Sequence, residues 1–220
     1  MIGGFFRWDW ALDHTDLVVE GLREHFWLTF LAVGIGFAIS FPLAILAYRQ
    51  RRFYGPLVGV SGVLYTIPSL ALFAFLAPFT GLSTTSAEVG LVSYTLLILV
   101  RNIVAGLDGV SEDAKEAARG MGYTRSQLLW RVELPLAIPT IVAGIRIATV
   151  TTIGLVTVTA VIGKGGVGAL ILFGLQRRFS TAIIMGAVLS LLLAITVDFL
   201  LIRAERLVAP WSARREARTA

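Results

Sequence analysis

Long apolar runs without a single charge constrain this chain more than any other feature. Four runs contain no Asp, Glu, Lys or Arg: residues 26–48, 53–87, 147–163 and 179–197. A helix needs about 20 apolar residues to cross a bilayer. Of the 220 residues, 56% are hydrophobic and only 15% are charged, which is not the composition of a soluble domain. The sequence therefore predicts an all-helical, polytopic membrane protein.

The spacing of these runs predicts five spanning helices. We expect them at about residues 26–48, 57–79, 88–107, 137–162 and 180–202. The run 53–87 is too long for one span, and its cluster from Gly81 to Thr85 is typical of a turn. An amphipathic lead-in, 1–25, precedes the transmembrane domain, 26–203, and a basic tail, 204–220, follows it.

Lys and Arg gather in alternate connections, which predicts the orientation. With the N-terminus outside, the inside segments carry twelve of these residues and the outside segments five. Because basic residues are enriched in cytoplasmic loops, we expect the N-terminus outside and the C-terminus inside. The net charge of +5 then reflects basic residues at the cytoplasmic ends of spans and a tail beside membrane lipids, not nucleic-acid binding.

The cytoplasmic loop at about 108–135 has the signals of two short helices. Ser111 is a plausible N-cap, and Gly120 ends the first helix. Thr124 and Gln127 form a capping box for the second, which we expect to end before Pro135. Small residues on one face of the first helix (Ala114, Ala117, Ala118 and Met121) allow a partner surface to approach closely. A connecting hairpin with no partner is the alternative.

One spacing in this loop resembles a known motif. Glu-Ala-Ala, three residues, Gly, nine residues and Val-Glu-Leu-Pro are similar to the EAA loop of membrane subunits of ATP-binding-cassette importers, whose pattern ends in Ile-x-Leu-Pro. In that family the loop docks on the ATPase subunit and transmits its closure to the membrane helices. The resemblance implies a coupling role for Glu116, Ala117, Ala118, Gly122, Val132, Leu134 and Pro135.

Four further stretches resemble the branch of these permeases that imports glycine betaine, choline, carnitine and related osmoprotectants. They are residues 65–78, 101–110, 116–150 and 161–172. The sequence departs from the branch at Tyr65, where Gln is common, and at Lys164, where a small residue is usual. A lysine that faced the path at the outer mouth would disfavour a cationic substrate.

The resemblance also implies an assembly. We expect a type I importer fold in a bacterial or archaeal cytoplasmic membrane, with a second permease chain, identical or similar, completing the path. Separate ATPase subunits would bind ATP and Mg²⁺, so no cofactor is expected in this chain, which would be a transport subunit and not an enzyme. A solute-binding protein would deliver substrate outside. The alternatives are an importer of another small solute and an ion-coupled secondary transporter, which would show inverted repeats and deep ionisable residues.

A proline in the second span marks a candidate translocation path. Pro68 removes a backbone hydrogen bond and kinks a helix, and freed carbonyls are tolerated where protein or a water-filled cavity covers them. Tyr65, Thr66 and Ser69 flank this position and are candidates to line the path. The alternative is a packing kink in which Thr and Ser bond within their own helix.

Glycines after the fourth span mark a candidate outer gate. Gly163, Lys164, Gly165 and Gly166 break the helix, and we expect a re-entrant segment over 168–178. A close contact between small residues is the compatible alternative.

Ionisable residues within the spans are few. We expect Arg101 and Arg146 to reach the cytoplasmic interface, and Asp198 to pair near Arg203. The chain has no cysteine and two histidines eleven residues apart, so neither a metal site nor a catalytic set is expected.

Overall fold

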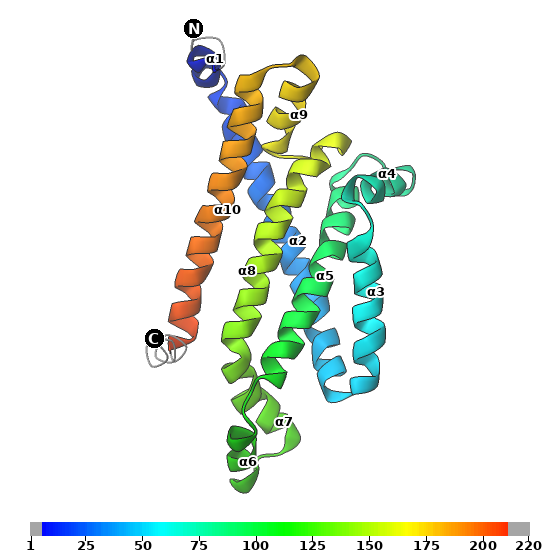
Figure 1. Cartoon of the computed structure of the whole chain (residues 1–220), viewed down its shortest axis with the longest axis vertical. Coiled ribbons are helices and arrows are strands. Elements are labelled where there is room, and N and C mark those ends of the chain that lie inside the picture. The colour runs from blue at the N-terminus through cyan, green and yellow to red at the C-terminus, as the bar shows by residue number, and fades with distance from the viewer. Residues whose placement is uncertain (1–5, 211–220) are drawn as a thin grey trace.

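The computed structural model describes residues 6–210, and this part of the chain consists of helices joined by short connections (Figure 1). In chain order the elements are α1 (Trp8–Asp13), α2 (Thr15–Arg49), η1 (Arg51–Phe53), α3 (Tyr54–Thr66), α4 (Ser69–Thr80), α5 (Thr84–Asp108), α6 (Glu112–Gly120), α7 (Arg125–Leu128), η2 (Leu129–Glu133), α8 (Leu134–Val158), η3 (Thr159–Ile162), α9 (Gly168–Arg177) and α10 (Ser180–Val208). Here η1 and η3 are 3₁₀ helices and η2 is a π-helix. The predicted all-helical class is confirmed.

Helix α5 is the centre of the bundle. It packs against α2, α8, α3 and α4, and 56% of its apolar window is buried. Helix α10 packs against α9 and α8, and only 6% of its window is buried. The chain alone therefore leaves most of α10 uncovered. Four described helices are long enough to span a membrane, and α3 with α4 makes a fifth crossing if the bent pair counts as one.

Small residues let the central helices approach closely. A Cβ atom added at Gly36 of α2 would lie 1.9 Å from Thr95 Oγ1 of α5, and one at Gly144 of α8 would lie 2.3 Å from the Asn102 Cβ of α5. Buried aliphatic residues of α2, α5 and α8 form a core toward the α6 end, and a second core includes Phe73.

The two ends of the bundle carry different elements. Figure 1 places α6, α7 and the end of α10 at one end, and α1, α4 and α9 at the other. Successive connections thus lie at opposite ends of the bundle, as the predicted spans require. Most of the predicted basic tail, and the start of the lead-in, fall on residues 211–220 and 1–5, outside the described residues.

The single kinked helix expected over 57–79 is wrong. Helices α3 and α4 are separate and bend by 93°. Ile67 is extended, with φ −63° and ψ 127°, because the ring of a following proline disfavours the helical region. Pro68 is extended as well, with ψ 130°. The chain therefore turns here instead of continuing straight across.

Two predicted helix boundaries also differ. Helix α2 begins at Thr15, so the second part of the lead-in belongs to a 35-residue helix. The second loop helix was expected to end before Pro135, which is wrong, because α7, η2 and α8 follow one another without a break. Pro135 lies directly after the π-helix η2, and the wider turn of a π-helix locally departs from the α-helical hydrogen-bond register, which accommodates a residue without an N–H.

Candidate functional site

The first helix of the predicted coupling loop is built as its sequence indicates. Ser111 caps α6 by accepting a hydrogen bond from the Ala114 N–H at 3.4 Å. Glu112 and Asp113 occupy the first turn, where the helix dipole favours acidic residues. The helix ends at Gly120, and Gly122 takes a φ of +82° that glycine adopts readily.

The capping box at the start of α7 is confirmed. Gln127 Oε1 accepts from the Thr124 N–H at 2.8 Å, and Thr124 Oγ1 accepts from the Gln127 N–H at 3.3 Å. Both loop helices are thus held by local side-chain bonds. The loop is a preorganised projection and not a flexible linker.

The predicted coupling residues divide into an exposed and an anchoring set. Glu116, Ala117 and Gly122 are exposed at the tip of the loop, beside Met121, whose side chain is 68% exposed. The anchoring set is Ala118 and Leu134, which are buried, and Val132 and Pro135, which are half-buried. The exposed set offers a partner a surface that is small, partly apolar and acidic, while the anchoring set joins the loop to the bundle.

A buried polar cluster that the sequence analysis missed lies behind this surface. Lys115 of α6 and Glu133 of η2 are each 6% exposed. Lys115 Nζ donates to Glu112 Oε1 at 2.9 Å, and Tyr48 Oη of α2 donates to Glu133 Oε1 at 3.0 Å. The only available signal was local: a lysine three residues after a glutamate on one helix, and a glutamate inside the Val-Glu-Leu-Pro stretch.

Two side chains of the loop, outside the spans, have shifted pKa values. The Lys115 ammonium, which donates to its carboxylate, holds the pKa of Glu112 below its usual range. Burial lowers the pKa of Lys115, but the hydrogen bond to Glu112 and the neighbouring Tyr48 raise it by more, so the pKa stands above its usual range. At neutral pH both side chains are therefore charged and paired.

The break between α3 and α4 brings the predicted path residues to an exposed corner. Tyr65, Thr66 and Pro68 are exposed and Ser69 is half-buried. Thr66 Oγ1 donates to the Val63 carbonyl of its own helix at 2.8 Å, which is the alternative considered for this hydroxyl. Their role in a path stays a prediction.

One residue that the sequence analysis did not single out stabilises this break. Tyr94 Oη of α5 donates to the Ile67 carbonyl, which the break leaves without a helical partner. The Tyr94 ring also packs edge-on against the Tyr65 ring, with centroids 5.9 Å apart. The break is thus held by the central helix.

The predicted outer gate is a tightly packed glycine loop. Gly163 and Gly166 have φ of +78° and +53°. A Cβ atom at Gly165 would lie 2.4 Å from that of Ala160, and one at Gly166 would lie 2.6 Å from that of His25. The close small-residue contact is therefore present, and α9 occupies the expected re-entrant segment. Gating stays a prediction.

Two side chains of α2 join this helix to the glycine loop and to α8. Glu24 Oε2 accepts a hydrogen bond from the Gly166 N–H at 3.0 Å, and His25 Nε2 donates to the Ile153 carbonyl at 3.0 Å. His25 is fully buried. The loop therefore cannot shift without breaking contacts to the N-terminal half of α2.

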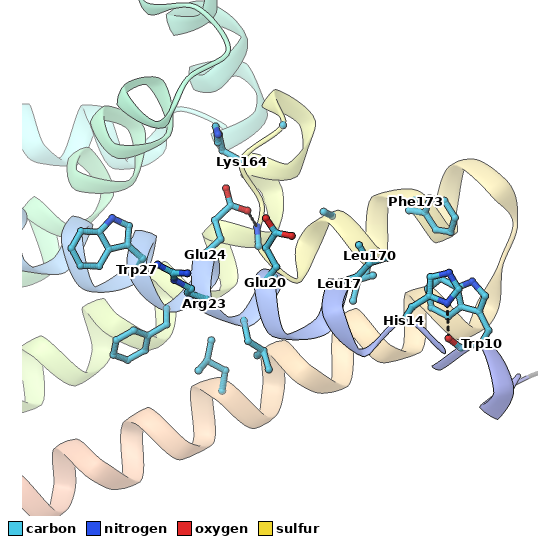
Figure 2. Close-up of a pocket in the computed structure, with 17 residues that line it drawn as sticks. Trp10, His14, Leu17, Glu20, Arg23, Glu24, Trp27, Lys164, Leu170 and Phe173 are labelled. Carbon is cyan, nitrogen blue, oxygen red and sulfur yellow. Dashed lines mark hydrogen bonds between the residues drawn. The ribbon is translucent and has the colours of Figure 1, made fainter. Parts of the chain in front are cut away.

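A groove of about 1330 Å³ lies beside this loop, between α2, α9 and α10 (Figure 2). Figure 2 shows Glu20 and Glu24 extending from α2 on the side where Lys164 lies. At one end of the groove Trp10 stacks on His14, with ring centroids 4.4 Å apart. The groove thus combines aromatic walls with charges of both signs.

The predicted partner of Asp198 is wrong. Arg146 of α8 donates to both carboxylate oxygens of Asp198 of α10, from Nε at 2.8 Å and from Nη2 at 3.0 Å. Arg203 instead lies 4.8 Å from the ring centroid of Phe199. The pair ties the weakly covered α10 to the bundle, because a charge in this position is stable only with a close partner.

No group of three or more His, Asp or Glu that could hold a metal ion occurs within residues 6–210. The fold defines a polytopic, all-helical membrane protein that carries a preorganised loop projecting from one end of its bundle.

The comparisons agree with this class. The chain belongs to the family described as binding-protein-dependent transport system inner membrane component, which matches residues 32–210. It is 38% identical over 206 residues to the osmoprotectant import permease protein OsmW of Salmonella typhimurium, covering 91% of this chain and 96% of that protein. It is also 38% identical to the choline transport system permease protein OpuBB of Bacillus subtilis, with coverage of 87% and 88%.

The fold is similar to that of a solved importer. An inward-facing structure of the MetNI methionine ABC transporter contains a chain that matches with a TM-score of 0.78 and 25% identity, over 89% of this chain and 98% of that one. The predicted type I importer fold is therefore confirmed. The chain is a multi-pass inner-membrane transport subunit.

Proposed function

We propose that this chain is the transmembrane permease subunit of an ATP-driven importer for small osmoprotectants such as glycine betaine, choline or carnitine. The observation that carries the proposal is the 38% identity to an osmoprotectant import permease over nearly the whole of both chains. The specific EAA-type spacing and its projecting, capped loop support the same class of function.

Energy enters through the projecting loop. The exposed Glu116, Ala117 and Gly122 dock on a separate ATPase subunit, which binds ATP with Mg²⁺; this chain supplies no ATPase site of its own. Closure of the ATPases displaces α6, and the continuous run from α7 into α8 transmits that displacement to the membrane. ATP thus favours one of two global states, which is the thermodynamic content of coupling.

The path lies between two permease chains, this one and an identical or similar partner. Tyr65, Thr66, Pro68 and Ser69 line the path at the break of the second crossing. The N-terminus faces outside and the C-terminus faces the cytoplasm, so a solute-binding protein meets the end that carries α9 and the outer groove.

The charge of Lys164 does not by itself exclude a quaternary ammonium solute. Glu20 and Glu24 extend from α2 on the side where Lys164 lies (Figure 2). Carboxylates on the same side of the groove as an ammonium group offset part of its field. The outer mouth therefore presents mixed charge, which suits a zwitterion or a cation.

Purification and transport assays test the proposal in two steps. The tagged chain is purified from its native membrane in mild detergent, and co-purifying proteins are identified by mass spectrometry. We expect an ATPase and a solute-binding protein. Recovery without an ATPase in several detergents would overturn the proposal and return attention to an ion-coupled transporter.

The cargo is then tested with the recovered complex in proteoliposomes. Uptake of glycine betaine, choline and carnitine is measured with and without internal ATP, and methionine serves as the control solute. ATP-dependent uptake of an osmoprotectant is the expected result. Uptake of methionine alone would refute the osmoprotectant assignment and leave the importer class standing.

A further inference from the structure

The coupling helix α6 stands apart from the membrane helices. It packs against α7 and η2 and projects below the bundle (Figure 1). On this helix Glu116 and Ala117 are exposed to solvent, whereas Lys115 is only 6% exposed. A buried ammonium group is costly unless it is paired, so the position of Lys115 requires specific partners.

Lys115 has partners on two elements, α6 and α2, and its partner on α2 in turn bonds to η2. Lys115 Nζ donates to Glu112 of its own helix at 2.9 Å and interacts electrostatically with Tyr48 at the end of α2. Tyr48 Oη donates to Glu133 of η2 at 3.0 Å. We call Lys115, Tyr48 and Glu133 the Tyr48 cluster. The hydrogen bond between Tyr48 and Glu133 joins α2 to η2, against which α6 packs, and Lys115 places the buried face of α6 beside the same tyrosine.

The Tyr48 ring also contacts a cation. The Arg51 guanidinium lies 5.4 Å from the centroid of the Tyr48 ring. Arg51 also donates to both carboxylate oxygens of Asp108, with one of these bonds at 2.9 Å. The end of α2 is thus tied to the end of the central helix α5 at the point where the cluster reaches it.

We propose that the Tyr48 cluster is the joint through which α6 moves α2 together with α8. Its three members are positioning residues for coupling, and the proposal rests on the proposed function, in which a partner ATPase displaces α6. Without the joint, α6 would displace η2 and the start of α8 while α2 stayed behind. With it, both helices follow the same displacement.

The first test measures the joint in the chain alone. The sequence has no cysteine, so spin labels can be placed cleanly by Arg49→Cys in α2 and Asp113→Cys in α6, both exposed positions. The distance distribution between the labels is recorded by electron–electron double resonance in lipid nanodiscs. We expect a narrow distribution in the parental background and a broader one after Tyr48→Phe or Lys115→Met.

A matched variant controls for the loss of a tyrosine hydroxyl as such. Tyr54 begins α3 at the same end of the bundle, is half-buried, and its hydroxyl makes no hydrogen bond to any residue from 6 to 210. Tyr54→Phe is therefore expected to keep the narrow distribution. An equally narrow distribution in all variants would overturn the joint.

The second test measures coupling in the complex with its ATPase and binding protein in proteoliposomes. Loss of a hydrogen bond to a buried carboxylate predicts that Tyr48→Phe lowers the solute transported per ATP hydrolysed by about fivefold to tenfold, with ATPase recovery unchanged. An unchanged ratio with ATPase bound would overturn the joint only. Absence of ATPase from the parental complex would overturn the proposed function. Because the parental complex is purified first, that result is distinguished from a failure of the joint before any variant is compared.

Discussion

Replacing Gly166 by alanine tests how rigidly the glycine loop between η3 and α9 is built. Gly166 and Gly163 lie in the same loop, and both have positive φ, +53° and +78°. Their surroundings differ. A Cβ atom at Gly166 would lie 2.6 Å from the His25 Cβ and 2.7 Å from its Cα, whereas one at Gly163 meets nothing within 4 Å. Gly163→Ala is therefore the matched control for backbone strain without a clash.

The expected loss of folding free energy has two contributions, backbone strain and a steric clash. Alanine in the left-handed region costs roughly 1–2 kcal/mol, and this applies at both positions. Forcing extra volume into a packed site adds about 1–3 kcal/mol. The clash is with the backbone of α2 at His25, whose ring also donates to the Ile153 carbonyl, so His25 cannot retreat cheaply. We expect a loss of about 2–5 kcal/mol for Gly166→Ala and of about 1–2 kcal/mol for Gly163→Ala.

Thermal unfolding of the purified chain in detergent measures the difference. For a chain of this length 1 kcal/mol corresponds to a shift of about 2–4 °C in Tm, so Gly166→Ala should unfold at least about 2 °C below Gly163→Ala. Equal shifts, or a smaller shift for Gly166→Ala, would refute the packing argument. Transport by both variants then shows whether rigidity of this loop matters for gating.

Three further outcomes are expected. Glu116→Gln and Gly122→Ala should lower uptake by membrane vesicles without lowering the amount of inserted protein; normal uptake would contradict the coupling role. Asp198→Asn should destabilise the chain by about 1–2 kcal/mol through loss of charge-assisted hydrogen bonds. In a double-mutant cycle with Arg146→Gln the two losses of stability should be non-additive, and additive losses would contradict a stabilising interaction between these side chains. Because the folded pKa of Glu112 is lowered, its stabilising bond is present above the usual glutamate range and is lost as pH falls through the lowered pKa; hydrogen exchange of α6 should rise there, and Glu112→Gln should remove this dependence.

The coupling loop shows how far local interactions carry a prediction. The Ser111 cap, the end of α6 at Gly120 and the capping box at Thr124 were all expected from residues at most a few positions apart. Such bonds form within one turn of a helix and need no knowledge of the rest of the chain. The end of the second helix was missed because continuation through η2 depends on how Leu129 and Leu134 pack into the core beside α5.

The break between α3 and α4 was predicted only in part. Pro68 marked the position of an irregularity, but a proline alone is compatible with a mild kink. The 93° bend also requires a donor for the freed Ile67 carbonyl, and Tyr94 of α5 supplies it from 27 residues away. Only the packing of α5 against α3 and α4 brings that hydroxyl to the break.

By itself the sequence determined the helical class, four of the spanning helices, their alternation between two ends and the capped loop, because hydropathy and capping act over single helices. The tertiary structure decided which distant side chains meet: Arg146 with Asp198 across 52 residues, Tyr48 with Glu133 across 85, and Glu24 with the outer loop across 142. These meetings depend on which faces of α2, α5, α8 and α10 pack together. Apolar helix surfaces in a membrane protein differ little in composition, so close packing, and not the pattern of hydrophobic residues, selects those faces.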